Sequence, residues 1–181
     1  MKSPLSLPAR TWHIAFFNTL IFICGTIFGT SLAIADGQPV IVNIKRMSLD
    51  TALTAAQASI AACRKEGVQI TVTIIDRGGH PQVVLRDVLA MDVSIPISRD
   101  KAYTAMSFNS PTGNLEDRFK GSYGVPKTQG LLIARGGLPI VAGGTIFGAI
   151  GVSGAPSGET DEKCAQAGID AILDNLEMSA E

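Results

Sequence analysis

The stretch that decides the fold runs from residue 70 to residue 86 and reads ITVTIIDRGGHPQVVLR. Apolar residues alternate with threonine at its start, which is typical of a β-strand with one buried face. Gly78-Gly79 then supplies a tight turn, because glycine tolerates the positive φ angles that two-residue turns require. Residues 81–86 return as a second strand. The sequence therefore predicts an antiparallel hairpin.

Three further strands are expected nearer the C-terminus, joined by Gly-Gly turns. The expected strands are residues 131–134, 138–142 and 145–152, and the turns between them are residues 136–137 and 143–144. Gly148 and Gly151 lie inside the last strand, where glycine marks the close approach of another backbone, a helix or a ligand. Because the links between strands are tight, we expect an antiparallel sheet of about five strands.

Helices are expected before, between and after the strands. Ser48 is a good N-cap for a helix that ends near Gly67, Ser98 is expected to cap one that runs to Phe108, and the last begins near Thr160. A turn or two of helix is expected over residues 114–119, and residues 121–130 are predicted to form a loop. Long helices at both ends of the fold must cover the sheet, so the expected class is α+β.

The N-terminal segment has the parts of a secretory signal peptide. Lys2 and Arg10 precede an uncharged apolar run over residues 14–34, which ends in the small-x-small pattern Ala33-Ile34-Ala35. We therefore predict a signal peptide over residues 1–35, a single domain over residues 36–181, and a periplasmic or secreted protein. The alternative is an uncleaved anchor, because the run is long enough to span ~30 Å of hydrocarbon.

The charge of the mature chain excludes two classes of partner. Cleavage removes Lys2 and Arg10 from the 15 basic residues and none of the 16 acidic ones, so the formal net charge falls from −1 to −3. No basic stripe remains for nucleic acid, and no polybasic run remains to hold a membrane surface after cleavage.

Cys63 and Cys164 are the cysteines of the mature chain. They could pair in an oxidising compartment. Each lies on an expected apolar helix face, so we predict two unpaired buried thiols. There is no Cys/His cluster with the spacing of a zinc site.

Several motifs together resemble the GlcG/HbpS family, which includes the C-terminal domain of PduO proteins. They are residues 76–80 with Arg86, residues 98–105 with Phe108, and residues 136–139, 148–154 and 161–165. The resemblance covers about residues 46–176. It implies a profilin-like sheet flanked by helices and homo-oligomers from dimers to octamers. Some members bind haem, including exported ones linked to haem sensing, and others belong to glycolate or diol-utilisation gene clusters.

Haem binding requires an axial ligand, an apolar slot and cations for the propionates. His80 is the one histidine of the mature chain and is expected at an exposed hairpin tip. Some relatives use a histidine in the first helix, which this sequence lacks, and others use a weaker oxygen ligand, so Thr104 is a candidate. Tyr103, Met91 and Met106 are further candidates, each also explained as a packing residue.

Basic residues beside the expected glycine turn suggest an anion site. Arg86, Arg99 and Lys101 are the candidate cations, with surface ion pairs as the alternative explanation. A pocket that suits a small carboxylate or a haem edge would combine Lys101, Thr104, Phe108, Gly136 and Gly137. Glycine there would let backbone N–H groups approach an anion.

A catalytic interpretation is also open. Asp76, Glu162 and Lys101 would form an acid/base set if they converge, although Glu162 is equally explained by the dipole of its helix. Three functions therefore stand: an exported haem- or tetrapyrrole-binding carrier, buffer or sensor input, an accessory protein or enzyme for a small hydroxy- or oxo-acid, and a ligand-free oligomeric interaction module.

Overall fold

The computed structural model of the chain describes residues 39–180. The expected signal peptide, residues 1–35, lies outside the described residues. A compact body begins at Val42 and contains every helix and strand of the described part. Within that part, no helix combines the length and apolar character needed to cross a membrane.

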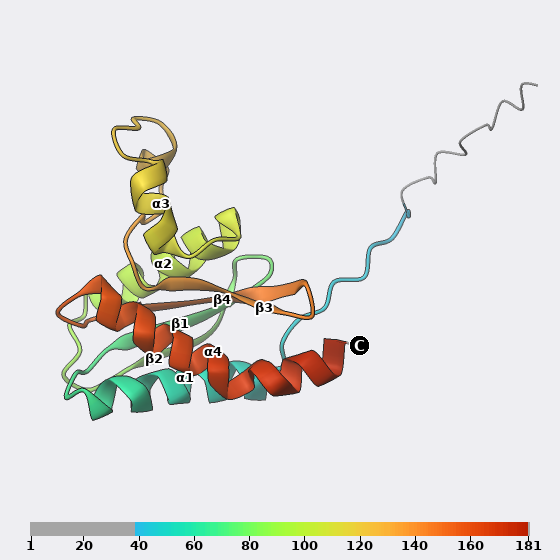
Figure 1. Cartoon of the computed structure of the whole chain (residues 1–181), viewed down its shortest axis with the longest axis horizontal. Helices are drawn as coiled ribbons and strands as arrows, with labels where there is room; N and C mark the ends of the chain where they lie inside the picture. The colour runs from blue at the N-terminus through green and yellow to red at the C-terminus, as the bar shows by residue number, and fades with distance from the viewer. Residues whose placement is uncertain (1–38, 181) are drawn as a thin grey trace, which may run out of the picture. The chain divides into compact units, whose positions relative to one another are not determined.

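One antiparallel sheet with strand order β2-β1-β4-β3 organises the body (Figure 1). The elements in chain order are α1 (Leu49–Lys65), β1 (Thr71–Asp76), β2 (Pro81–Arg86), α2 (Ser94–Phe108), α3 (Thr112–Arg118), the 3-10 turn η1 (Val125–Lys127), β3 (Gly137–Ala142), β4 (Thr145–Ser153) and α4 (Gly158–Ala180). Helices α1 and α4 lie on one side of the sheet and α2 and α3 on the other. The α+β class is confirmed.

The sheet has four strands where about five were expected. The predicted strand at residues 131–134 does not join the sheet. The N–H of Leu132 donates instead to Oγ1 of Thr104 at 2.8 Å, which ties this segment to α2. The other four strands and both hairpins form where the alternation and the glycine pairs predicted them.

Helix α2 begins five residues earlier than expected, with Val93 in place of Ser98 at its N-cap. Ser98 does not cap the helix but lies buried inside it, with Oγ 2.8 Å from Oγ1 of Thr73 on β1. Ser94 makes the same kind of bond, 2.6 Å, to Oγ1 of Thr71. Hydroxyl pairs therefore fix α2 to the central strand β1, and these pairs satisfy polar groups that burial would otherwise leave unpaired.

Two strand glycines allow α2 to lie directly on the sheet. A Cβ on Gly151 would fall 2.0 Å from the carbonyl oxygen of Ser98, and a Cβ on Gly137 would fall 2.4 Å from that of Lys101. Any side chain at either position would push the helix away. The interpretation of Gly151 as a point of close helix approach is confirmed.

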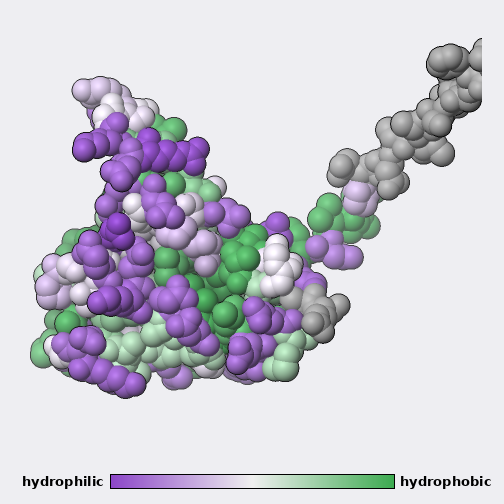
Figure 2. Space-filling view, in the orientation of Figure 1, coloured by the Kyte–Doolittle hydropathy of each residue, from purple (hydrophilic) through white to green (hydrophobic). Residues whose placement is uncertain are grey.

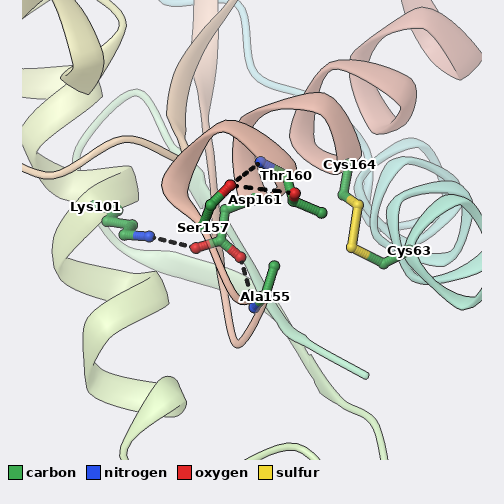
Figure 3. The surroundings of a disulfide bond; sticks show 7 residues. All are labelled: Cys63, Lys101, Ala155, Ser157, Thr160, Asp161 and Cys164. Atoms are coloured by element: carbon green, nitrogen blue, oxygen red, sulfur yellow. Dashed lines mark hydrogen bonds and ion pairs between the residues drawn. A yellow bond between two sulfur atoms is a disulfide. The ribbon is translucent and has the colours of Figure 1, made fainter. Parts of the chain in front are cut away.

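The opposite face holds the larger apolar core, covered by α1 and α4. The two helices pack closely because Gly168 on α4 faces the backbone of Ala55 on α1. Cys63 and Cys164 are brought to a Cα–Cα distance of 5.5 Å and form a disulfide (Figure 3). The prediction of two unpaired thiols is therefore wrong, because each cysteine faces the other helix as well as the core.

Candidate functional site

Lys101 is a buried cation with partners inside the body. Its Nζ lies 2.7 Å from Oδ2 of Asp161 (Figure 3). It also donates to the carbonyl of Val152 at 3.0 Å. The N–H of Ala155 donates to the other oxygen of Asp161 at 3.0 Å. Burial raises the pKa of the Asp161 carboxyl above its usual range, an effect larger than the opposing pull of Lys101 and Ala155. Lys101 thus joins α2 to β4 and to the first turn of α4, and its side chain is buried.

Of the residues expected to line a pocket with Lys101, Gly136 and Gly137 pack directly against it, while Thr104 and Phe108 have other partners. Gly136 has a φ of 113°, and a Cβ there would fall 2.9 Å from Nζ of Lys101. Oγ1 of Thr104 donates to the carbonyl of Asp100 at 2.7 Å and is fully buried. Phe108 packs edge-on against Phe119, with ring centroids 5.3 Å apart. These contacts leave the Thr104 hydroxyl in a structural role.

Asp76 organises the β1–β2 turn. Its Oδ1 accepts the backbone N–H groups of Gly78 at 2.8 Å and His80 at 3.0 Å, and Arg46 lies 3.3 Å from Oδ2. Burial raises the pKa of this carboxyl, but the two N–H donors and the charges of Arg46 and His80 together lower it below the usual value. The His80 side chain is 79% exposed at the hairpin tip, as expected.

The proposed acid/base set does not assemble. Glu162 lies at the start of α4 with Oε1 3.7 Å from Nη1 of Arg135, while Asp76 pairs with Arg46 and Lys101 with Asp161. Each of the three groups therefore has a different partner of opposite charge. Glu162 Oε2 is buried without a hydrogen-bond partner, and an added Cβ on Gly113 would fall 3.0 Å from it.

A hollow of about 200 Å³ opens beside Tyr103, and we call it the Tyr103 hollow. Its lining residues are Gly79, Arg99, Asp100, Tyr103, Gln129 and Gly130. The ring of Tyr103 lies against the hairpin tip, because a Cβ on Gly79 would fall 2.8 Å from its Cε2. Arg99 lies one helical turn away with Nη2 2.8 Å from Oδ1 of Asp100. The hollow therefore brings together Tyr103, Arg99 and Gly79, the residue that precedes His80.

Large apolar side chains lead from β2 to the Tyr103 hollow. They are Val88, Leu89, Met91, Val93 and Ile95, which we call the 88–95 segment, and each is at least 40% exposed. Ile95, Arg99 and Tyr103 follow at four-residue spacing along α2, so they share one face of the helix. The 88–95 segment and the Tyr103 hollow are therefore connected along the outer face of α2.

Two more cavities, each of about 290 Å³, lie elsewhere. One is lined by α1 and β2 residues together with Asp87, and we call it the α1–β2 cavity. The other is an apolar groove beside the edge strand β3 and helix α4, lined by Pro111, Leu138, Pro139, Val141, Gln166, Ile169 and Leu173. Figure 2 shows an apolar area over this groove. Lys101, Thr104 and Gly136 line none of these three cavities.

Two ion pairs escaped the sequence analysis. Asp161, which neutralises Lys101, is 60 residues away in the chain, and Asp87 pairs with Arg64 across 23 residues. No spacing rule connects such positions, since they meet only after α2 and α4, or α1 and β2, pack on the sheet. The local sequence contained one sign of such a pair, which is the position of the Asp87 carboxylate directly after the end of a strand.

Comparisons with known proteins agree with this fold. A family model described as "Haem degrading protein HbpS-like" matches residues 47–170. An uncharacterised 15.0 kDa protein of Citrobacter freundii, from the dhaT–dhaS intergenic region, is 33% identical over 135 residues, covering 72% of this chain and 94% of that protein.

Solved structures extend the agreement. A double mutant of Streptomyces reticuli HbpS is 36% identical with a TM-score of 0.70, over 73% of this chain and 90% of that one. The PduOC–heme complex is 28% identical with a TM-score of 0.66, over 71% of this chain and 96% of that one. The chain described here, which shares their α+β fold over most of its length, belongs to the HbpS-like family.

Proposed function

We propose that the protein is an exported haem- or tetrapyrrole-binding protein that acts as a carrier, buffer or sensor input. Family membership and the heme complex of PduOC support haem as the ligand. The apolar leader over residues 1–35 supports export. The observation that carries the proposal is the set of exposed apolar side chains in the 88–95 segment, together with the α2 face that continues from Ile95 through Arg99 to Tyr103.

An open surface fits haem better than an enclosed pocket does. The three cavities hold about 200 to 290 Å³, and pockets for drug-sized ligands hold about 300–1,000 Å³. Among their lining residues only Tyr103 is of a type that ligates haem iron. The bound group would supply the iron chemistry, while this chain supplies the apolar contact, a ligand and charge.

The residues we assign to haem lie along the outer face of α2. Val93 and Ile95 would contact the macrocycle, the Tyr103 phenol would face the iron, and Arg99 would neutralise a propionate. His80 follows the lining residue Gly79 and is the alternative ligand. Thr104 is not assigned, because its buried hydroxyl already binds Asp100 and Leu132.

The same exposure supports a homo-oligomer. Val88 and Leu89 are each 77% exposed and adjoin further exposed apolar side chains. Large apolar patches on a protein surface usually mark an interaction site. A second copy that covers the outer part of the 88–95 segment would complete an apolar slot above Tyr103.

Titration of the purified protein with haemin tests the proposal. We expect a saturable shift in the Soret region and at least tenfold weaker binding for Tyr103→Phe. The matched control is Tyr123→Phe, because Tyr123 is also exposed but lies outside the Tyr103 hollow. His80→Ala gives a separate arm. Absence of saturation would overturn the function, and loss of binding in His80→Ala alone would overturn the role of Tyr103.

A further inference from the structure

One edge strand of the sheet, β3, is protected against pairing with another strand. The N–H of Val152 on β4 donates to the carbonyl of Gly136 at 2.8 Å. Because alternate residues of an antiparallel strand face the same neighbour, Gly137 and Pro139 face away from β4. The N–H of Gly137 donates to Oγ1 of Thr112 at 2.9 Å, and its carbonyl accepts from the same hydroxyl at 3.3 Å. Proline has no N–H, so this edge offers little to an added strand.

The other edge strand, β2, has no such protection. The N–H of Asp87 donates to the carbonyl of Ile70 at 3.0 Å, in register with the pairing of β2 and β1. By the same alternation, the backbone groups of Gln82, Val84 and Arg86 face away from β1. Within residues 39–180, these outward N–H and C=O groups have no hydrogen-bond partner. Such a row of free donors and acceptors is a template for a further strand.

The side chain at the centre of this open edge is apolar and exposed. Val84 is 44% exposed and lies on the α2 side of the sheet, because it is opposite Thr73, whose hydroxyl bonds to α2. Arg86 lies on the same side, and its Nη1 donates to the carbonyl of Ala90 within the 88–95 segment. A molecule that pairs with β2 would therefore also cover part of the 88–95 segment.

We propose that β2 of one copy pairs with β2 of a second copy, so that two sheets join into one antiparallel sheet across a two-fold axis. The inference rests on the homo-oligomer of the proposed function and adds the surface through which it forms. With the axis at Val84, this residue meets its own copy, and Gln82 lies opposite Arg86 of the second copy. Each outward backbone group then faces another outward group, so the free donors and acceptors are satisfied in the pair.

The charges on β2 favour a second copy as the occupant in this register. Like charges directly opposite each other destabilise a strand pair. An axis at Val84 keeps the two copies of Arg86 apart and places each against the neutral amide of Gln82. The edge is therefore complementary to itself in backbone, apolar contact and charge.

Cysteine cross-linking tests the register. In a hydrogen-bonded antiparallel pair, opposite Cα atoms lie about 5.5 Å apart, a distance that a disulfide spans. Under mild oxidation, Val84→Cys should give at least ten times more covalent dimer on a non-reducing gel than the matched control. That control is Val141→Cys, because Val141 is 39% exposed on the protected edge strand β3. Equal amounts of dimer in the two variants would overturn the proposal.

A charge at the axis tests the assembly without a new covalent bond. Val84→Lys places two ammonium groups opposite each other, and lysine is common on exposed edge strands that stay unpaired. Sedimentation equilibrium should give a dissociation constant at least tenfold higher than for the native protein and for Val141→Lys. An unchanged constant in Val84→Lys would overturn the proposal.

Haemin titration of the native protein separates this inference from the proposed ligand. An assembly that passes both tests but binds no haemin would support the pairing of β2 and overturn the haem proposal. A monomer that binds haemin would do the reverse.

Discussion

Lys101 and Asp161 form an ion pair in which both side chains are only 5% exposed. Removing two charges from water is costly, and the cost is offset here by hydrogen bonds from Lys101 to Val152 and from Ala155 to Asp161. The pair therefore fixes one geometry between α2 and the first turn of α4. The pair favours this arrangement of the two helices because, in any other arrangement, one of the two charges would be buried without its partner.

Asp161→Asn should lower the free energy of unfolding by about 3–5 kcal/mol, because the ammonium of Lys101 would stay buried without a counter-charge. Urea unfolding measures the change. Asp174→Asn, an exposed position on the same helix, should change it by no more than about 0.5 kcal/mol. Similar losses in the two variants would show that the pair is unimportant.

Acid should weaken the fold through Asp76 and Asp87. The pKa of Asp87 is lowered chiefly by its hydrogen bonds from Arg64, and that of Asp76 by its turn N–H groups and nearby charges, against the effect of burial. Unfolded Asp titrates near pH ~3.9, so this stability is complete above that pH and is lost as the pH falls through the lower folded values. The Asp76→Asn/Asp87→Asn double variant should show a flatter loss between about pH 5 and 2 than the native protein. The free energy of unfolding is measured by urea unfolding at each pH. If it falls with pH equally steeply in the double variant and in the native protein, the assignment is contradicted.

At the scale of elements, the disulfide joins the last turn of α1 to the first turns of α4 across 101 residues. Loops of this length gain about 4.7 kcal/mol of stability in the chain-entropy account. The Cys63→Ala/Cys164→Ala variant should therefore unfold at lower denaturant, with a loss of about 2–5 kcal/mol.

A reducing agent provides the control for this prediction. Dithiothreitol should lower the denaturation midpoint of the native protein toward that of the double variant and leave the variant unchanged. A native midpoint that does not respond to dithiothreitol, at concentrations that reduce the bond, would contradict it.

Elements encoded by neighbouring residues were predictable. The hairpin of β1 and β2 follows from period-two alternation around Gly78-Gly79, and Gly151 was correctly read as a contact point. The segment 131–134 is apolar enough for a strand but binds Thr104 on α2 instead. Pairing of Cys63 with Cys164 depends on how two helices far apart in the chain pack together, which no local pattern encodes.

At the scale of the whole molecule, the sequence predicted which residues lie close together more accurately than it predicted the roles of those residues. Lys101, Gly136 and Gly137 do meet, yet the meeting is a packed contact, because Asp161 already supplies the anion that the sequence analysis sought in a ligand. The Tyr103 hollow draws on three segments of the chain, and the α1–β2 cavity draws on two. Such sites exist only after folding.

Export is the prediction that concerns the entire chain. Expression of the full sequence in a Gram-negative host should yield a periplasmic product whose intact mass corresponds to a start at Asp36, because Ala33-Ile34-Ala35 has the small residues that signal peptidase requires. Fractionation followed by mass spectrometry measures this. A full-length product in the membrane fraction would show an uncleaved anchor instead.

The bond between Cys63 and Cys164 closes the chain into a ring that contains every strand, with α2 and α3. The stretch between α3 and β3 is the natural target of a protease, since Tyr123 there is 82% exposed. A single cut at that point would leave two fragments that are still joined by the disulfide. If the protein is exported as proposed, a nicked copy would persist as one molecule and separate into its fragments only on reduction.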